Sequence, residues 1–249
     1  CALTKVGVLV RPTGKGQHYE GLVTSLEQAR ASGDEAVLLW QRLPNDCDLF
    51  VMRDLGQGQL VASSYVQCLI VDDGLRRPEL KCDLSIVVVD NGVSDLVFPL
   101  GPCREDNGLL KSADIVWLNK VDEASKRPPV DAKVRSRYVP VGLVNQMNQT
   151  ESLEILRTNP VSIVCGIGRP ESFYRTLRPY VNEVIRVFEY GDHEVFQCPE
   201  PVRENELIIT TEKDLARLQG VAAVWALRVE LVVEHWDGQL EQTLKELCA

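Results

Sequence analysis

The chain has 249 residues, 45% hydrophobic and 25% charged, which is the composition of a globular protein with room for one large or two small cores. Its formal net charge of -9 argues against broad binding of nucleic acids, which needs a basic surface. No apolar run approaches the ~18 residues that a membrane-spanning helix needs, and the first residues lack the charged-then-apolar order of a signal peptide. The eight cysteines form no C-x-x-C pair, which argues against a zinc site and favours a reducing compartment.

The first predicted element is a strand at residues 6–10, followed by a turn rich in glycine and proline. Gly14-Lys15 in this turn looks like part of a phosphate loop. Such a loop needs a glycine six residues before its lysine and a serine or threonine directly after it, whereas this chain has Leu9 and Gly16 there. Pro12 also removes one backbone N–H donor. An ordinary turn is therefore the favoured interpretation, and the phosphates of a nucleotide must be bound elsewhere.

Asp34 and Glu35 stand in front of an apolar, helix-forming run that ends near Leu43. Carboxylates at the start of a helix cap free N–H groups and suit the positive end of the helix dipole, so a structural role would by itself explain both residues. The segment predicts a helix from about residue 34. A short strand at 49–52 and a short helix around 60–62 are predicted to follow.

The strand predicted at 68–71 runs directly into Asp72, Asp73 and Gly74. Four apolar residues in a row predict a buried parallel strand, and ligands of open α/β sheets bind beyond the carboxyl ends of such strands. A pair of carboxylates there suits Mg²⁺ and, through it, the phosphates of a nucleotide. An ordinary acidic turn is the alternative, because Asp and Gly are both common turn residues.

Two further segments, 84–90 and 113–119, repeat the pattern of a buried strand that ends in a polar residue. Three such strands separated by longer connections predict a parallel, doubly wound α/β sheet. The last of them ends in Asn119-Lys120-Val121-Asp122, which matches the Asn-Lys-x-Asp pattern by which GTPases recognise guanine. So short a pattern often arises by chance at strand ends. Because no phosphate loop accompanies it, we interpret it as a coincidence.

A second, smaller α/β unit is predicted from about residue 162. Its strands are expected at 162–165, 183–188, 207–211 and 224–229, with a helix at 169–177 that has proline in its first turn and a terminal helix with a leucine stripe. We therefore expect two domains, residues 1–155 and residues 156–249. His193 follows Asp192 in a loop after a strand, where functional residues concentrate, although a lone histidine is more often structural.

Seven short motifs follow one another along the chain: Gly33-Asp34-Glu35, Asp72-Asp73-Gly74-Leu75, residues 83–90, Gly101-Pro102-Cys103-Arg104-Glu105, Gly168-Arg169-Pro170-Glu171-Ser172-Phe173, Asp192-His193 and Thr211-Glu212-Lys213-Asp214. Each is weak by itself. Their order and approximate spacing resemble the tetraacyldisaccharide 4'-kinases, the lipid A 4'-kinase family, over nearly the whole chain. The resemblance implies a P-loop-NTPase-like doubly wound parallel sheet with a second, smaller α/β domain.

The resemblance also implies an activity. A member of this family is a lipid kinase that uses ATP and Mg²⁺ to phosphorylate the 4'-hydroxyl of a tetraacyldisaccharide 1-phosphate in lipid A biosynthesis. It would work in the cytoplasm, peripheral to the inner membrane of a bacterium, with a glycolipid partner and no nucleic acid.

Two departures from the family pattern stand out. Arg11-Pro12-Thr13-Gly14 follows the strand that matches the second strand of the family, where the family has Arg-Gly-Tyr-Gly. The phosphate loop and the membrane-associated N-terminal segment are therefore expected before residue 1, and the 249 residues alone are expected to have little kinase activity. Arg76-Arg77 also replaces the Gln-His of the family, which puts the local phosphate or lipid contacts in doubt.

The resemblance assigns the catalytic pair to Asp34 and His193, which would activate the sugar hydroxyl together. Their chemistry agrees, since a carboxylate beside an imidazole can hold it in the proton-accepting tautomer or share the proton. We expect His193 and Asp72 to face one another across the cleft between the domains.

The metal carboxylates in this scheme are Asp72 and Asp73, with Glu35 as a further metal partner. Arg11 looks like an anion contact, because the guanidinium fork suits phosphate. Arg104 and Glu105 are the other predicted substrate residues.

Two interpretations of a different class remain. One is a catalytically inactive interaction or regulatory protein on the same fold, which the absence of a complete phosphate loop in the sequence and Arg76-Arg77 would favour. The other is a GTPase-like switch built on Asn119-Lys120-Val121-Asp122. Binding of ATP, of GTP or of neither separates the three.

Overall fold

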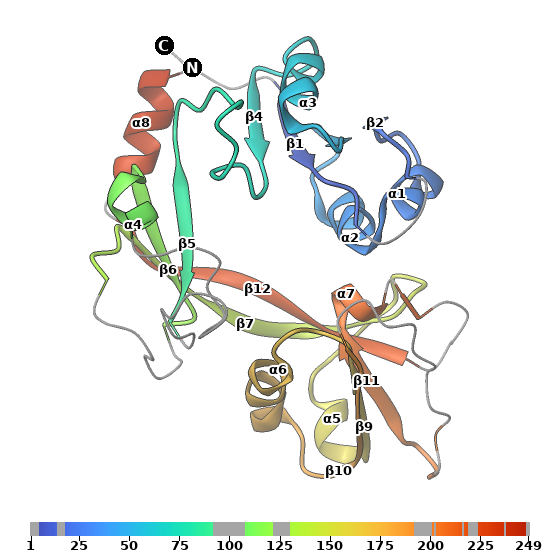
Figure 1. The fold of residues 1–249 in the computed structure, drawn as a ribbon. Coiled ribbons are helices and arrows are strands. Elements are labelled where there is room, and N and C mark those ends of the chain that lie inside the picture. The colour runs from blue at the N-terminus through green and yellow to red at the C-terminus, as the bar shows by residue number, and fades with distance from the viewer. Residues whose placement is uncertain are drawn as a thin grey trace. The chain divides into compact units, whose positions relative to one another are not determined.

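The computed structural model describes residues 5–13, 18–91, 108–121, 130–191, 201, 203–215, 217–218, 224–236 and 238–247 (Figure 1). Their contacts divide them into two compact units. The larger unit comprises the described parts of 4–72 and 140–230, and the smaller unit those of 73–139 and 231–249. Two long strands, β7 (Val134–Val144) and β12 (Val224–Trp236), contribute residues to both units. The domain boundary predicted near residue 155 stays a prediction.

The first sheet of the larger unit has the strand order β2-β3-β1-β4. Its strands are β1 (Val6–Val10), β2 (Gly21–Leu22), β3 (Cys47–Val51) and β4 (Cys68–Val71). Both β3 and β4 pair with β1 in parallel, so their carboxyl ends lie at one edge of the sheet. The short strand β2 is antiparallel to β3.

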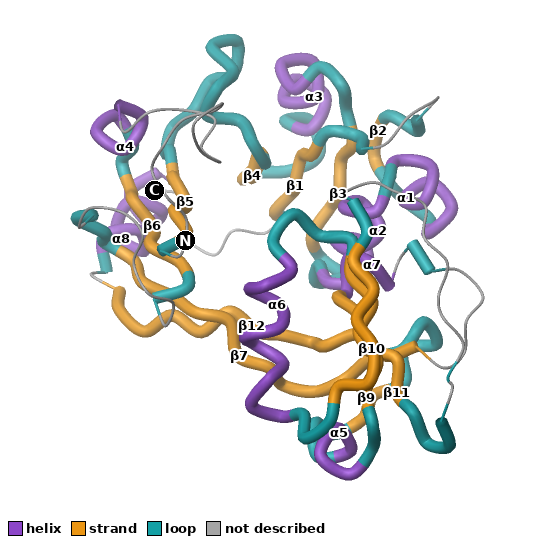
Figure 2. Tube along the Cα trace, turned by 60° about the horizontal axis from the view of Figure 1, so that its bottom comes forward, coloured by secondary structure: helices purple, strands orange, loops and turns teal. Residues whose placement is uncertain are grey.

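Helices cover both faces of this sheet, as the doubly wound prediction requires (Figures 1 and 2). The helices are α1 (Leu26–Ser32), α2 (Asp34–Arg42) and α3 (Leu55–Ala62). Successive side chains of a strand point to opposite faces. Val8 and Val10 accordingly belong to a core cluster with residues of α1 and α2. Leu9 points the other way and meets Gly58 of α3, where an added Cβ would lie 2.8 Å from the leucine side chain.

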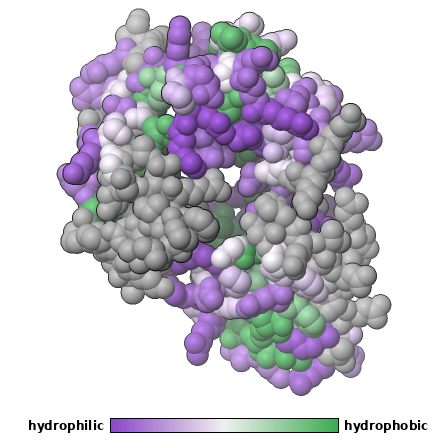
Figure 3. All heavy atoms as spheres, viewed as in Figure 1, coloured by the Kyte–Doolittle hydropathy of each residue, from purple (hydrophilic) through white to green (hydrophobic). Residues whose placement is uncertain are grey.

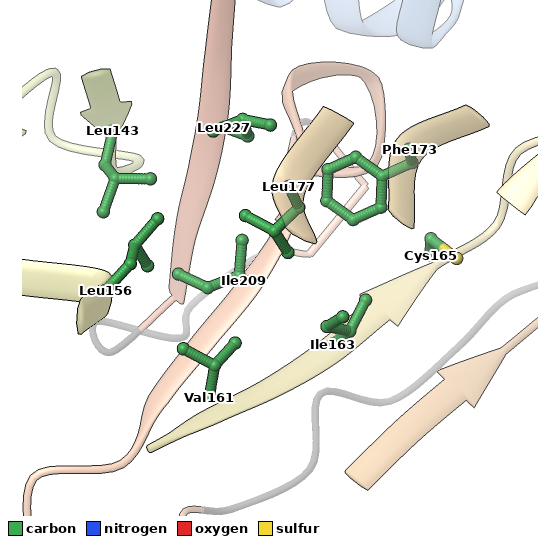
Figure 4. Close-up of a cluster of buried hydrophobic side chains, with 9 residues drawn as sticks. All are labelled: Leu143, Leu156, Val161, Ile163, Cys165, Phe173, Leu177, Ile209 and Leu227. Atoms are coloured by element: carbon green, nitrogen blue, oxygen red, sulfur yellow. The ribbon is translucent and has the colours of Figure 1, made fainter. Parts of the chain in front are cut away.

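The second sheet of the larger unit has the order β10-β9-β11-β12, and all of its pairings are parallel. The elements here are β9 (Val161–Cys165), β10 (Val184–Glu189), β11 (Leu207–Thr211), α5 (Ile155–Thr158), α6 (Pro170–Leu177), the 3₁₀ turn Arg178–Tyr180 and α7 (Glu212–Leu215). A core cluster of nine buried side chains, drawn in Figure 4, packs α5 and α6 on these strands. On the face shown in Figure 3, apolar side chains gather around the same two helices.

The smaller unit contains the order β7-β6-β5, again with parallel pairing. Its elements are β5 (Ile86–Asp90), β6 (Ile115–Asn119), α4 (Gly108–Ser112) and α8 (Gln239–Leu247). The two-residue strand β8 (Thr150–Glu151), which belongs to the larger unit, pairs with the carboxyl end of β7.

The structure confirms the α/β class and every strand and helix named above as a prediction, with small shifts at the ends. The burial predicted for β4 and β5 is wrong, because Ile70 is 55% exposed and Val88 is 62% exposed in the described structure. Sequence reasoning missed β7 altogether and the second half of β12. Every residue of β12 from 231 to 236 is exposed, so this part lacks the buried apolar pattern that identifies a strand. In the described part of the chain, no helix combines the length and the apolar character needed to cross a membrane.

Candidate active site

Asp34 is positioned by a sharp corner between two helices. Helix α1 ends and α2 begins around Gly33, whose φ of 115° lies in the region that side chains other than hydrogen rarely allow. A Cβ at Gly33 would overlap the hydroxyl of Thr13 and lie 2.7 Å from its carbonyl oxygen. The glycine therefore lets the turn after β1 pack directly on the helix corner, and Asp34 is held beside the carboxyl end of the sheet.

The two carboxylate oxygens of Asp34 have different surroundings. Oδ1 accepts hydrogen bonds from the Thr13 hydroxyl at 2.9 Å and from the backbone N–H of Glu35 at 3.1 Å. Oδ2 is buried and has no hydrogen-bond partner among the described residues, which stop at Thr13 and resume at His18. A buried polar atom without a partner costs about 1–3 kcal/mol, and in a native protein it calls for a reason. An acceptor for a substrate proton is such a reason.

Asp72 lies at the same edge of this sheet. Its backbone N–H donates to the carbonyl oxygen of Leu9 at 3.0 Å, which extends the β1–β4 pairing by one residue and sets Asp72 beside Val10. Arg11 follows directly, and both of these side chains are exposed. Asp73 takes a left-handed conformation with a φ of 51°, which turns the chain away from the strand.

The parallel pairing of β1 with β4 and the helix corner at Gly33 thus bring four polar residues, Arg11, Thr13, Asp34 and Asp72, to one edge of the first sheet. This is the place where ligands of open α/β sheets bind. The arrangement offers one exposed cation, one exposed carboxylate and one partly buried carboxylate with an open oxygen. Such a set can bind a phosphate, hold a hydrated metal ion and accept a proton.

A metal site is compatible with this edge. The exposed carboxylate of Asp72 suits Mg²⁺, which keeps several of its waters and needs only one or two protein carboxylates. Glu35 is half-buried at the start of α2. The described residues contain no group of three or more His, Cys, Asp or Glu side chains close enough to hold a metal ion by themselves. The metal roles of Asp72, Asp73 and Glu35 stay predictions.

The remaining predicted site residues, Arg104, Glu105 and His193, lie outside the residues that the structure describes. Their roles, and the approach of His193 to Asp72, also stay predictions.

Comparison with known proteins identifies the family of this chain. The family model described as tetraacyldisaccharide-1-P 4'-kinase matches residues 2–249. The chain belongs to the tetraacyldisaccharide 4'-kinase family. A curated tetraacyldisaccharide 4'-kinase of Methylorubrum extorquens is 34% identical over 212 residues, which cover 80% of this chain and 63% of that protein. One from Anaeromyxobacter sp. strain Fw109-5 is 30% identical over 98% of this chain and 74% of its own length.

A solved structure agrees with this assignment. The crystal structure of LpxK from Aquifex aeolicus in complex with ATP superposes with a TM-score of 0.75 and 25% identity, covering 98% of this chain and 79% of that one. This confirms the predicted kinase-type fold. The chain spans just under two thirds of the length of the Methylorubrum kinase, at 63%.

The Thr211-Glu212-Lys213-Asp214 motif of this family member lies at the end of β11, and both carboxylate oxygens of its Asp214 have hydrogen-bond partners. Asp214 is completely buried, and its Oδ2 accepts from the backbone N–H of Gly166 and from the Thr211 hydroxyl, both at 2.9 Å. Its Oδ1 accepts from Arg217 at 3.2 Å. The Asp214 N–H in turn donates to the Thr211 hydroxyl at 3.1 Å, which caps the start of α7.

Glu212 of the same motif connects α7 to the helix that carries Asp34. Arg42, in the last turn of α2, donates to Glu212 Oε1 at 3.4 Å and to the carbonyl oxygen of Val229 at 3.1 Å. Arg228 of β12 reaches the same carboxylate oxygen at 3.3 Å. The sequence singled out this motif without giving it a role; the contacts make it a structural support for α2.

The Asn-Lys-x-Asp match is used internally in this kinase fold. The side-chain amide of Asn119 donates to Asp90 at 3.2 Å, and its oxygen accepts from the Ser136 hydroxyl at 3.0 Å. Lys120 pairs with the other oxygen of Asp90 at 2.7 Å. These contacts explain the residues Asn119 and Lys120 without a guanine base, and Asp122 lies outside the described residues.

A buried thiol and a half-buried phenol lie side by side at the second sheet. The Tyr174 hydroxyl lies 3.3 Å from Cys165 Sγ and donates to Glu189 at 2.7 Å. Burial, together with the contacts to Cys165 and Glu189, raises the pKa of Tyr174. Burial is also the main cause that raises the pKa of the Cys165 thiol. Both groups are therefore neutral near pH 7 and lock α6 to β9 and β10.

Proposed function

We propose that the protein carrying this chain transfers the γ-phosphate of ATP to the 4'-hydroxyl of a tetraacyldisaccharide 1-phosphate. Family membership and the likeness to an ATP-bound LpxK support this activity. Within the chain, the observation that carries it is the unpartnered Oδ2 of Asp34, at the sheet edge that also holds Arg11 and Asp72. We also propose that the protein acts in the cytoplasm, at the inner membrane of a bacterium, where a lipid substrate with four acyl chains is found.

In this reaction the oxygen of the 4'-hydroxyl forms the new bond to the γ-phosphorus, and the bond from that phosphorus to the bridging oxygen of ADP breaks. The hydroxyl proton goes to Asp34 Oδ2, and His193 shares or relays it. Such general-base assistance is typically worth about 10²- to 10⁴-fold in rate. Because Oδ1 already accepts two hydrogen bonds, the proton is directed to Oδ2.

The metal and anion contacts complete the proposed site. Asp72, with Asp73 next to it in the chain and Glu35 next to Asp34, would hold Mg²⁺, which neutralises charge on the phosphate oxygens when it is bound. Arg11 and Arg104 would bind phosphate groups of the nucleotide or the lipid, with Glu105 beside Arg104. The guanidinium groups orient these anions through paired N–H donors.

The 249 residues contain no complete G-x-x-x-x-G-K-[ST] sequence. In P-loop kinases this loop supplies backbone N–H groups, a lysine and a metal-binding hydroxyl to the transferred phosphate. We therefore propose that these residues expressed alone phosphorylate the lipid poorly, and that efficient transfer needs such a loop.

The test is a transfer assay with ATP labelled in the γ-phosphate and a tetraacyldisaccharide 1-phosphate in mixed micelles. The full product of the gene should label the lipid at the 4'-position in the presence of Mg²⁺. The same assay on the 249 residues alone should give much less product. A full-length protein that binds neither ATP nor the lipid would identify it as an inactive member of the fold, and a preference for GTP would favour a switch instead.

A further inference from the structure

The contact between Thr13 and Asp34 joins segments 21 residues apart in the sequence. Thr13 is half-buried in the turn that leaves β1. Its backbone N–H donates to the carbonyl oxygen of Ser32 at 2.9 Å, and its hydroxyl donates to Asp34 Oδ1 at 2.9 Å. One residue thus binds the end of α1 through its backbone and the start of α2 through its side chain.

This contact is held in place by the glycine beneath it. Thr13 packs so closely on Gly33 that a Cβ there would overlap its hydroxyl. The backbone bond to Ser32 fixes the turn in the same position. The backbone of Thr13 is therefore held in one position, so its hydroxyl donates to Asp34 from a fixed direction.

The fixed position of Thr13 restricts the orientation of the Asp34 carboxylate. With Oδ1 held by the Thr13 hydroxyl and by the Glu35 N–H, the Asp34 carboxylate is kept from rotating. Its other oxygen then keeps a fixed direction in a buried setting. Reacting groups must be placed to within a fraction of an ångström, and a 1 Å displacement can cost about 10²-fold in rate.

We propose that Thr13 is a positioning residue of the phosphotransfer reaction, which holds Oδ1 of Asp34 so that Oδ2 takes the proton of the acceptor hydroxyl. This inference rests on the proposed function and adds to it a residue that acts through Asp34. The hydroxyl of Thr13 makes no contact with substrate in this scheme.

The experiment measures kcat and KM for three variants of the full-length protein. Thr13→Val keeps the shape of the side chain and removes the donor, so kcat should fall by roughly 10- to 100-fold while KM for ATP stays nearly constant. Thr13→Ser keeps the donor and should restore most of the lost rate. Thr13→Ala removes the donor without adding volume and should repeat the valine result, which guards against a folding defect specific to valine. Thr158→Val, at an exposed threonine of α5, is the matched control.

A double-mutant cycle separates positioning from a merely structural role. In an Asp34→Asn background Thr13→Val should have almost no further effect on kcat, because its influence passes through the carboxylate. Equal losses in both backgrounds would overturn the inference. So would an unchanged kcat for Thr13→Val in an active enzyme, and this result would leave the proposed function intact. A wild-type protein that labels no lipid would overturn the proposed function and the inference together.

Discussion

Asp34 and Asp214 both lie in the first turn of a helix, yet their oxygens are used in opposite ways. Asp214 is completely buried, and three donors from Gly166, Thr211 and Arg217 saturate it. Asp34 accepts two hydrogen bonds on one oxygen and none from the described residues on the other. The saturated carboxylate can only support structure. The half-satisfied one can still accept a proton or a ligand.

The difference shows that two aspartates at similar places in a helix can have different roles. Both residues lie in motifs of the kinase family, and the resemblance assigned a catalytic role to Asp34 and none to Asp214. Hydrogen-bond accounting separates them, because folding tends to satisfy every buried polar group unless function requires an open one. The predictions below test that separation, beginning with the largest expected effect.

Replacing Asp34 by asparagine should lower kcat by about 10²- to 10⁴-fold, because the amide keeps the size of the side chain but cannot take the proton. Nucleotide affinity should stay close to that of the wild type, since a proton acceptor matters mainly in the transition state. Steady-state kinetics and calorimetric titration of ATP measure the two quantities. Asp46→Asn, at an exposed aspartate beyond the end of α2, is the control. Full activity of Asp34→Asn would end its assignment as the base.

Replacing Asp214 by asparagine should mainly lower stability. The amide would place N–H donors against donors that now point at a carboxylate, and breaking a buried ion pair typically costs about 3–5 kcal/mol. Urea unfolding measures the change in the free energy of unfolding. Glu241→Gln is the comparison, because it breaks only an exposed ion pair with Lys245, and exposed pairs contribute little to stability. Equal effects of the two substitutions would contradict the structural role of Asp214.

Gly33→Ala tests the corner that holds Asp34. The added methyl group meets Thr13 and also requires an unfavourable positive φ, so we expect a loss of about 1–3 kcal/mol in stability. Gly168→Ala is a matched control, because nothing lies within 4 Å of a Cβ at that glycine. A thermal melt of both variants decides the point. If the two melt alike, Thr13 does not pack on the corner as closely as described.

Asp72→Asn should change the Mg²⁺ concentration that the reaction needs more than it changes kcat at saturating Mg²⁺. Loss of a negative charge at the sheet edge weakens the hold on Mg²⁺, so the Mg²⁺ concentration for half-maximal rate should rise roughly tenfold. Titration of Mg²⁺ against Asp72→Asn and Asp34→Asn separates the two roles. Should Asp34→Asn move the Mg²⁺ midpoint and Asp72→Asn leave it, the two assignments are exchanged.

The sequence predicted the residues at strand and helix ends because local signals mark them. Asp72 follows four apolar residues, and Asp34 precedes a helical run, so both could be found from neighbours in the chain. The contact of Thr13 with Asp34 spans 21 residues, and that of Gly166 with Asp214 spans 48. No local pattern records such pairs, and only the folded chain could bring them together.

Prediction of the strands from the sequence was limited in the same way to segments with a clear local pattern. Buried strands such as β9 were predicted because every residue in them is buried and apolar or small. The outer half of β12 is exposed throughout, and β7 carries Arg135 and Arg137 between its buried positions. A strand that is solvated on both faces loses the period of two on which the prediction rests.

The smallest expected effect concerns a third aspartate, which adds to the comparison an exposed carboxylate with two hydrogen bonds on one oxygen. Asp114 Oδ2 accepts from the Ser85 hydroxyl at 2.6 Å and from the Ser85 N–H at 2.8 Å. These bonds favour the charged carboxylate, and they lower the pKa of Asp114 below its usual value. The unfolded chain therefore binds this proton at a higher pH than the folded chain does. The stabilisation is fully present above the unfolded pKa and is lost as the pH falls through the folded pKa.

Ser85→Ala should therefore raise the pKa of Asp114 toward its ordinary value, as followed by the carboxyl ¹³C shift in an acid titration. The stability difference between this variant and the wild type should be small at pH 7 because Asp114 is exposed, and its charge-dependent part should vanish under strongly acidic conditions. A difference that keeps its full size through that range would mean that the hydroxyl of Ser85 acts through packing. Hydrogen bonds to a carboxylate in solvent would then contribute little, and the contrast between Asp34 and Asp214 would depend on burial alone.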